Sequence, residues 1–311
     1  MKIKIALFLL TTITLSFSQE KRTFKTEDVN VTSLIDGTLY TPENASNKTK
    51  LVILIAGSGP TDRNGNQKSG ENNSLKFLSK ALAKNNIAVF SYDKRLFAQK
   101  KLGTLDEKTL RFDDFINDAN DVITYFKSQK KYSKIIVAGH SEGSLIGMVA
   151  AKNNADGYIS LEGAGRPINL VLSEQLAKQA PAHIEECNAY LELLKQGKTF
   201  ENKNPLLASL FRESVQPYLI SWIKYNPQEE LKKLTIPILI INGTKDIQTT
   251  EKEAYLLKEA NPNATMKIIE NMNHILKEIK EDAENIKSYS NPDLPVMPLL
   301  ITEIVNFVNR N

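Results

Sequence analysis

The sequence predicts an α/β fold: a mostly parallel, doubly wound sheet with a helical insertion. Short apolar runs alternate with segments of helical periodicity from residue 51 to residue 161. This alternation is typical of a parallel sheet that is covered by helices on both faces. It stops over residues 166–233, which are mostly polar and helical in pattern, and it resumes from residue 236. The middle segment is therefore expected to be inserted into a single sheet domain.

The expected strands follow from two patterns. Two short strands around a turn open the mature chain, and continuous apolar runs such as LVILIA at 51–56 indicate strands that are covered on both faces. In order, the expected strands are residues 24–31, 34–39, 51–56, 87–92, 135–138, 158–161, 236–241 and 264–269.

The expected helices lie where apolar residues recur every three or four positions. Residues 112–126 show this pattern most clearly, with acidic side chains between the apolar ones. In order, the expected helices of the sheet domain are residues 74–83, 112–126, 145–150, 251–259 and 299–307.

The first 18 residues have the pattern of a secretory signal peptide. Lys2 and Lys4 precede an apolar stretch at residues 5–15, and Ser16 and Ser18 provide the small residues of a cleavage site. The apolar stretch is too short to span a bilayer unaided, and an uncleaved membrane anchor is the alternative. We therefore expect an exported protein, periplasmic or extracellular, without stable membrane insertion after signal removal.

The mature chain is expected to form one large domain with an insertion. Residues 19–165 and 234–311 make up the predicted sheet domain, and residues 166–233 a helical cap with breaks expected at Pro181, Pro205 and Pro217. The sequence does not indicate an oligomeric state.

Composition excludes several function classes. The formal charge is +4, of which Lys2 and Lys4 carry two, so the mature chain is nearly neutral and nucleic acid is not an expected partner. Cys187 is the only cysteine, which excludes an internal disulfide. Three scattered histidines and one cysteine show no metal-ligand spacing, so no metal and no other cofactor is expected.

The most informative motif is GHSEG at residues 139–143, directly after the apolar run at 135–138. A buried strand that ends in Gly-x-Ser-x-Gly and continues into a helix is a nucleophile elbow. The turn is so tight that both glycines are needed, and it lifts the serine hydroxyl clear of the sheet. Ser141 is therefore the predicted nucleophile.

A serine hydroxyl needs a base to remove its proton, and the chain has three histidines. His140 precedes the nucleophile in the elbow, where neighbouring side chains diverge, and His183 lies in the polar cap. His274 follows the strand at 264–269, and open α/β sheets place their working residues in loops beyond the carboxyl ends of strands. His274 is the predicted base.

The acid that orients the base is expected between serine and histidine in chain order. Asp246 follows the strand at 236–241 and is the predicted acid, with a helix cap as the alternative role. Glu162, at the end of an earlier strand, is the second candidate.

Two backbone N–H groups are needed to stabilise the negative charge that develops on the substrate oxygen. One is expected from Glu142, the residue after the nucleophile. The other is expected from Ser58, in the loop of small residues at 57–66, which a flexible surface loop would also explain.

Taken together, the motifs resemble those of the α/β-hydrolase superfamily, bacterial carboxylesterase type. They are GSGPTDR at 57–63, YDKR at 92–95, GHSEG at 139–143 and GAGRP at 163–167. The resemblance implies a sheet domain with a helical cap, no cofactor, and a triad of Ser141, Asp246 and His274. The related serine aminopeptidase and monoglyceride lipase group commonly has a glycine after Tyr-Asp-x-Arg. Here LFAQ follows at 96–99, which favours an esterase.

The sequence leaves two possible roles open for a group of charged loop residues and for a group of aromatic cap residues. Asp62, Arg63, Asp93 and Arg95 either bind a polar substrate group or, as we favour, pair with one another and brace two loops. The cap aromatics either line an acyl pocket or, as we favour, form one buried helix face; they are Phe211, Tyr218, Trp222 and Tyr225.

The predicted function is therefore a serine hydrolase that cleaves small carboxylic esters through an acyl-enzyme. A peptidase or acyltransferase with the same triad is the alternative, and a non-catalytic binding protein on a hydrolase scaffold is the alternative of another class. Because the base must be neutral, activity is expected to fall as the pH drops through about 6.5, the unperturbed histidine value. The substrate-binding residues, the acyl and alcohol parts of the substrate and its natural source are not indicated.

Overall fold

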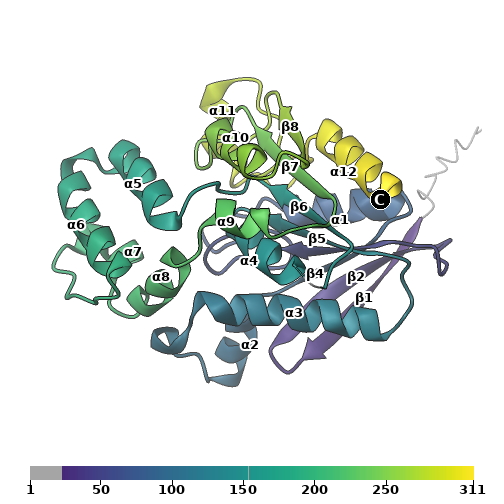
Figure 1. Cartoon of the computed structure of the whole chain (residues 1–311), viewed down its shortest axis with the longest axis horizontal. Coiled ribbons are helices and arrows are strands. Elements are labelled where there is room, and N and C mark those ends of the chain that lie inside the picture. The colour runs from purple at the N-terminus through teal and green to yellow at the C-terminus, as the bar shows by residue number, and fades with distance from the viewer. Residues whose placement is uncertain (1–22, 153) are drawn as a thin grey trace, which may run out of the picture.

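The structure, a computed structural model, describes residues 23–152 and 154–311, so the predicted signal peptide at 1–18 lies outside the described residues. One eight-stranded sheet forms the centre of the molecule (Figure 1), with the strand order β1-β2-β4-β3-β5-β6-β7-β8. The strands are β1 Phe24–Thr32, β2 Ile35–Pro42, β3 Leu51–Ile55, β4 Ala88–Tyr92, β5 Ile135–His140, β6 Gly157–Leu161, β7 Ile238–Gly243 and β8 Thr265–Ile269.

The sheet is antiparallel at one edge and parallel elsewhere. β2 pairs antiparallel with both β1 and β4, whereas every pair from β4 through β3, β5, β6 and β7 to β8 is parallel. This confirms the predicted mostly parallel sheet. Because parallel strands end at the same edge, the loops after β3, β5, β6, β7 and β8 lie along one side of the sheet.

Helices cover both faces of the sheet, so its central strands are buried throughout. On one face α3 (Phe112–Ser128) and α4 (Glu142–Ala151) pack on alternate residues of the strands, while α1 (Ser74–Lys84) and α12 (Pro298–Arg310) cover the other face. The remaining helices of this domain are α2 Arg95–Leu102, α10 Glu251–Ala260 and α11 Asp282–Ser288.

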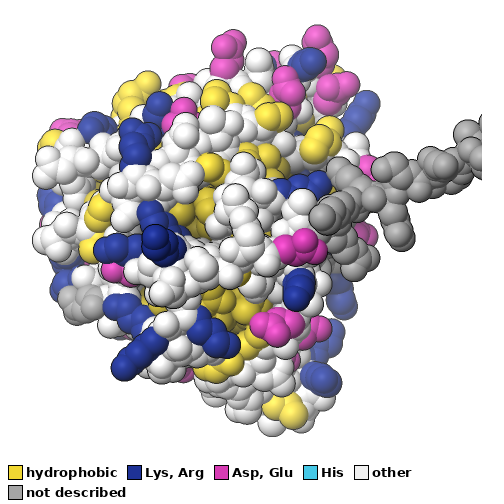
Figure 2. Space-filling model, turned by 90° about the vertical axis from the view of Figure 1, so that its right-hand side faces the viewer, with side chains coloured by type: hydrophobic (Ala, Val, Ile, Leu, Met, Phe, Trp, Pro, Cys, Tyr) yellow, Lys and Arg dark blue, Asp and Glu magenta, His cyan; other side chains and the backbone are white. Residues whose placement is uncertain are grey.

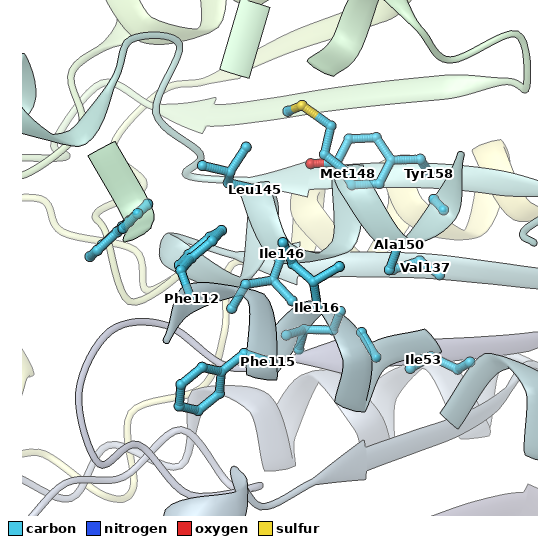
Figure 3. Packing of buried hydrophobic residues seen from close by; sticks show 14 of the residues in the cluster. Ile53, Phe112, Phe115, Ile116, Val137, Leu145, Ile146, Met148, Ala150 and Tyr158 are labelled. Carbon is cyan, nitrogen blue, oxygen red and sulfur yellow. The ribbon is translucent and has the colours of Figure 1, made fainter. Parts of the chain in front are cut away.

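The packing around α4 explains why the elbow helix is fixed in place. Figure 3 shows Ile146 of α4 close to Ile116 of α3, with Val137 of β5 to their right, next to Ala150. All three side chains are buried. Each fully buried aliphatic side chain of this kind contributes roughly 1.5–3 kcal/mol, so the start of α4 is held by a well-packed core.

The inserted segment contains helices α5 Ile168–Gln179, α6 Ile184–Lys195, α7 Ala208–Phe211, α8 Gln216–Ile223 and α9 Pro227–Lys232. The first four lie together beside the sheet domain, at the left of Figure 1. The fifth, α9, contacts α4 and α10 instead, so the chain is already back on the sheet domain before residue 233. Arg166 pairs with Glu253 of α10 and joins the start of this segment to the sheet domain.

Two helices have no counterpart in the sequence prediction. No residue of α2 is buried, and the buried residues of α11, Asn285 and Ser288, are polar. Neither helix therefore has an apolar stripe, which is the signal that predicts an amphipathic helix.

The surface is mixed in charge. On the face in Figure 2, the right-hand side of Figure 1, basic and acidic side chains lie between apolar ones. Among the described residues, no helix combines the length and apolar character that a membrane span requires.

Candidate active site

Ser141 lies at the sharp turn between β5 and α4 with a left-handed backbone conformation, at φ +54° and ψ −119°. The two flanking glycines explain how the turn closes. A Cβ atom on Gly139 would lie 2.0 Å from the Gly143 carbonyl oxygen, and one on Gly143 would lie 2.4 Å from that of Ile55. No side chain fits at either position, so the strained turn depends on both glycines.

The structure brings Ser141, His274 and Asp246 into one hydrogen-bonded row, although 133 residues separate the first two in the chain. His274 Nε2 lies 3.0 Å from Ser141 Oγ, and its Nδ1 lies 2.7 Å from Asp246 Oδ2. His274 and Asp246 are buried. This is the geometry in which an imidazole can take a proton from a serine while a carboxylate holds the ring.

Asp246 is held as an anion by its surroundings. Burial alone would raise its pKa, but the charge of His274 and hydrogen bonds, first from His274, lower the pKa to about 2. Its Oδ1 also accepts backbone N–H bonds from Gln248 and Thr249, and Oδ2 accepts the Thr249 hydroxyl. The carboxylate therefore orients the imidazole and shapes the turn at 246–249, but it does not cap the following helix, whose N-cap is Thr250.

Glu162, the second candidate acid, lies beside Asp246 instead of contacting the imidazole. Its Oε2 accepts the backbone N–H of Gly243 at 3.1 Å. Burial, and then the charge of Asp246 with a hydrogen bond to it, raise the pKa of Glu162 well above its ordinary value. The neighbouring Glu162 carboxyl in turn helps to lower the pKa of Asp246.

Glu162, Asp246 and His274 also form a cluster whose ligand atoms lie within 4.8 Å of one another. Both ring nitrogens of His274 already have partners in Asp246 and Ser141. A cation bound at Nδ1 or Nε2 would displace one of these bonds. The hydrogen bonds of His274 to Asp246 and Ser141 therefore explain why these side chains lie close together.

The other two histidines lie where they cannot act as the base toward Ser141. His183 is in the inserted segment, next to Asn204 and Glu186. His140 is buried, and its Nε2–H donates to the backbone carbonyl of His274 at 2.7 Å. Its role as a support for the His274 loop carries no signal in the sequence.

The loop after β3 lies against the elbow. A Cβ atom on Gly57 would lie 3.2 Å from the Cβ of Ser141, so the backbone approaches the nucleophile closely here. The Ser58 carbonyl accepts bonds from Thr61 Oγ1 and Gln67 Nε2, at 2.8 and 2.9 Å. The backbone of the predicted N–H donor is therefore held in one orientation.

We favoured pairing among the four charged residues of the two loops, and the structure shows this pairing for only two of them. Arg63 bonds Asp93 through its side chain and its backbone N–H, which joins the loop after β3 to the loop after β4. Arg95 instead pairs with Asp118 of α3. Asp62 accepts the backbone N–H groups of Asn64 and Asn66 and shapes its own loop.

Lys94, the third residue of the YDKR motif, is buried at the base of the site. Its Nζ donates to Glu142 Oε1 at 2.6 Å and to the Gly59 carbonyl at 3.3 Å. The side chains of Lys94 and Glu142 are 4% and 1% exposed, so this is a fully desolvated ion pair.

Two cavities of about 210 Å³ each meet at Ser141. One is lined by uncharged polar side chains besides the two histidines of the site, among them Ser58, Thr61, Gln67, Asn72, Gln248 and Tyr289. The other lies under the inserted helices and is mainly apolar, with Leu145, Val171, Leu172, Leu210, Leu219 and Trp222 in its wall.

The aromatic residues of the inserted segment were expected either to line an acyl pocket or to form one buried helix face, and the structure shows examples of both burial and pocket lining. Phe211 is fully buried against Tyr190, and Tyr225 bonds Asp113 of α3. Trp222 stacks on Phe112 and also lines the apolar cavity, so one of the four is a candidate pocket residue.

The fold and the elbow define a member of the α/β-hydrolase superfamily, as the sequence motifs predict. Residues 38–260 match the BD-FAE family model, and the chain belongs to the BD-FAE family. The esterase EstD from Thermotoga maritima is 29% identical over 272 residues, which cover 83% of this chain and 61% of EstD. The chain thus spans about three fifths of that relative's length.

Solved structures of the same fold include both esterases and a peptidase. Est1E from Butyrivibrio proteoclasticus has a TM-score of 0.59 and 16% identity, over 92% of this chain and 98% of Est1E. Proline iminopeptidase from Mycobacterium smegmatis has a TM-score of 0.54 and 14% identity, over 92% of this chain and 98% of that protein. At these identities the likeness concerns the fold alone, so the bond that is cleaved has to be argued from the site.

Proposed function

We propose that this protein is an exported serine hydrolase that cleaves carboxylic esters through an acyl-enzyme. The observation that carries the proposal is the row from Ser141 Oγ through His274 to Asp246, with hydrogen-bond distances of 3.0 and 2.7 Å. A hydroxyl, an imidazole and a buried carboxylate in this order are the three parts that nucleophilic acyl transfer requires.

In the proposed reaction, Ser141 Oγ attacks the acyl carbon while His274 Nε2 takes the hydroxyl proton. The N–H groups of Ser58 and Glu142 stabilise the tetrahedral oxyanion, and Asp246 stabilises the imidazolium. The imidazolium then returns the proton to the alkoxide as the alcohol leaves. A water molecule repeats these steps on the acyl-enzyme, which releases the carboxylic acid and restores Ser141.

The two cavities support an orientation for the substrate. The apolar cavity suits the acyl part because burial of apolar surface beside Leu172 and Trp222 is favourable. The other cavity offers hydroxyl and amide groups without a charged Lys, Arg, Asp or Glu, which suits a neutral polar alcohol part. For comparison, one structure of Est1E is described as having ferulic acid bound.

An ester is favoured over a peptide bond as the substrate. EstD, the relative at 29% identity, is an esterase, and the residues after Arg95 depart from the peptidase-related motif. Among the described residues that line the polar cavity there is no Asp or Glu, so an aminopeptidase substrate would have no carboxylate there to pair with its free amino group. Export rests on the sequence pattern of residues 1–18.

The test is Ser141→Ala in the mature chain, with p-nitrophenyl esters and aminoacyl-nitroanilides as substrates. We expect ester hydrolysis to fall by about 10⁴-fold or more without a change in thermal stability. A fluorophosphonate probe is expected to label the wild type and not the variant. Ser173→Ala is the matched control, because the Ser173 hydroxyl bonds Asn188 within the inserted helices. Ester hydrolysis that survives Ser141→Ala would refute the proposal.

A further inference from the structure

The buried ammonium group of Lys94 contacts both segments that carry the proposed oxyanion donors. Nζ donates to Glu142 Oε1 at 2.6 Å and to the Gly59 carbonyl at 3.3 Å. Glu142 is the first residue of α4, so its own N–H has no partner within the helix. Gly59 follows Ser58, the other expected N–H donor.

No local structure requires a lysine here. Lys94 is the residue before α2, and that helix has no buried residue of its own. The side chain nevertheless leaves solvent, and Nζ lies 5.4 Å from the centre of the Phe115 ring. Burial of a cation is costly unless it is paired, and here the partners are Glu142 and the Gly59 carbonyl.

The two partners belong to different segments, which also pack against each other where Gly57 meets Ser141. Glu142 is attached to the elbow, which the core packing of α4 holds in place. Gly59 lies in the loop after β3 and has a left-handed backbone conformation, at φ +70°. As a glycine it restricts the backbone of this loop less than other residues would. The Lys94 ammonium group lies between them and bonds both, so it holds the loop after β3 at a fixed position relative to Ser141.

We propose that Lys94 is a positioning residue, which ties the loop after β3 to the first residue of α4 and so holds the Ser58 and Glu142 N–H groups at a constant separation and angle. The inference rests on the proposed function. Oxyanion donors act by being aligned before the charge develops, so the role predicts an effect on the transition state and not on substrate binding.

The cap takes part in the same network. Burial raises the pKa of Tyr218 in α8 well above its ordinary value, and the charge of Glu142 and a hydrogen bond to it raise the pKa further. Glu142 also lines the apolar cavity together with Leu219 and Trp222 of α8, so the inserted helices lie close to the Lys94–Glu142 pair.

The test uses the double variant Lys94→Met/Glu142→Leu, which removes both charges and keeps the side chains apolar and close in volume. Buried ion pairs tolerate such replacement better than loss of one partner, so the double variant is expected to fold, as measured by thermal unfolding. We expect kcat for a p-nitrophenyl ester to fall about 10²-fold, and the inhibition constant of phenylboronic acid, which forms a tetrahedral adduct, to rise by about the same factor.

Ground-state binding is measured separately. Trp222 is the only tryptophan and lines the apolar cavity, so its fluorescence reports ester binding in a Ser141→Ala background. We expect the ester dissociation constant there to be unchanged by Lys94→Met/Glu142→Leu. The matched control is Arg95→Met/Asp118→Leu, which removes the neighbouring ion pair, with its 2.7 Å bond, and contacts neither Gly59 nor Glu142. It is expected to keep kcat and boronate affinity.

Two results would overturn the role of Lys94. One is unchanged kcat and boronate affinity in Lys94→Met/Glu142→Leu. The other is an equal loss of boronate and ester affinity, which would mean that the pair only supports the shape of the site. Failure of the proposed function itself would be recognised separately, because the wild type would then neither hydrolyse esters nor be inhibited by phenylboronic acid.

Discussion

The imidazole of His140 donates a hydrogen bond of 2.7 Å to the backbone carbonyl of His274. The residue before the nucleophile thus supports the loop that carries the proposed base, 134 residues later. Burial, the largest cause, lowers the pKa of His140 to about 4, and the charge of His274 acts in the same direction. At neutral pH the ring is uncharged and one nitrogen carries the proton that this bond requires.

The pKa of His140 predicts an acid-sensitive fold. Between pH 6.5 and about 4 the unfolded chain binds a proton at this residue and the native protein does not. Stability is therefore lost as the pH falls through this window, by up to about 3 kcal/mol at 1.36 kcal/mol per pKa unit. The measurement is thermal unfolding at several pH values for the wild type and His140→Gln. Equal pH slopes for the two proteins would contradict the prediction.

Replacing the carboxyl group by an amide is expected to reduce activity at Asp246 but not at Glu162. Asp246→Asn should lower kcat by roughly 10³–10⁴-fold, because the amide does not stabilise the imidazolium. Glu162→Gln should keep most of the activity, because burial and the charge of Asp246 raise the pKa of Glu162 and favour its neutral form. Steady-state kinetics of both variants on one ester show which carboxyl group the reaction depends on. A larger loss in Glu162→Gln would make Glu162 the functional acid.

The elbow is expected to tolerate no added side chain. In Gly139→Ala the new Cβ would lie 2.0 Å from a backbone oxygen of α4, and we expect a loss of about 3 kcal/mol or more. Gly197→Ala is the control, since its φ is +75° but no atom lies within 4 Å of the added Cβ. There we expect only about 1 kcal/mol from the left-handed conformation. Chemical denaturation measures both, and equal losses would refute the steric argument.

The apolar cavity is expected to set the acyl length. Val171 is buried in its wall, so Val171→Phe should fill the cavity and reduce kcat/KM for p-nitrophenyl octanoate about 10-fold while the acetate ester is little affected. Leu170→Phe, the next position on α5, is the control because Leu170 is 48% exposed. A parallel loss on both esters in Val171→Phe would mean that the acyl chain lies elsewhere.

Much of the fold could be predicted because its signals are local. The run at 51–56 predicts a buried strand through its continuous apolar character, and the observed strand is β3 Leu51–Ile55. The glycines at 139 and 143 predict the elbow, since only a residue without a Cβ fits there. By contrast, α2 was not predicted, because it buries none of its residues and its sequence has no apolar periodicity.

The candidate site divides in the same way. Chain order and the edge of a parallel sheet led us to predict Ser141, Asp246 and His274 from the sequence, with Glu162 as the second candidate for the acid. The contacts of Lys94 with Glu142 and of His140 with His274 were not foreseen, since each joins side chains from different loops.

The sequence by itself determined the strand and helix periods, the elbow and the residue types that the proposed chemistry needs. These depend on interactions within a few residues, which leave a pattern in the chain. Only the tertiary structure decided that Asp246 and not Glu162 contacts the imidazole, that Lys94 lies between Gly59 and Glu142, and that a polar and an apolar cavity meet at Ser141. The reason is that these relationships depend on the twist of the sheet and the packing of helices on it, which set distances between loops that are remote in sequence.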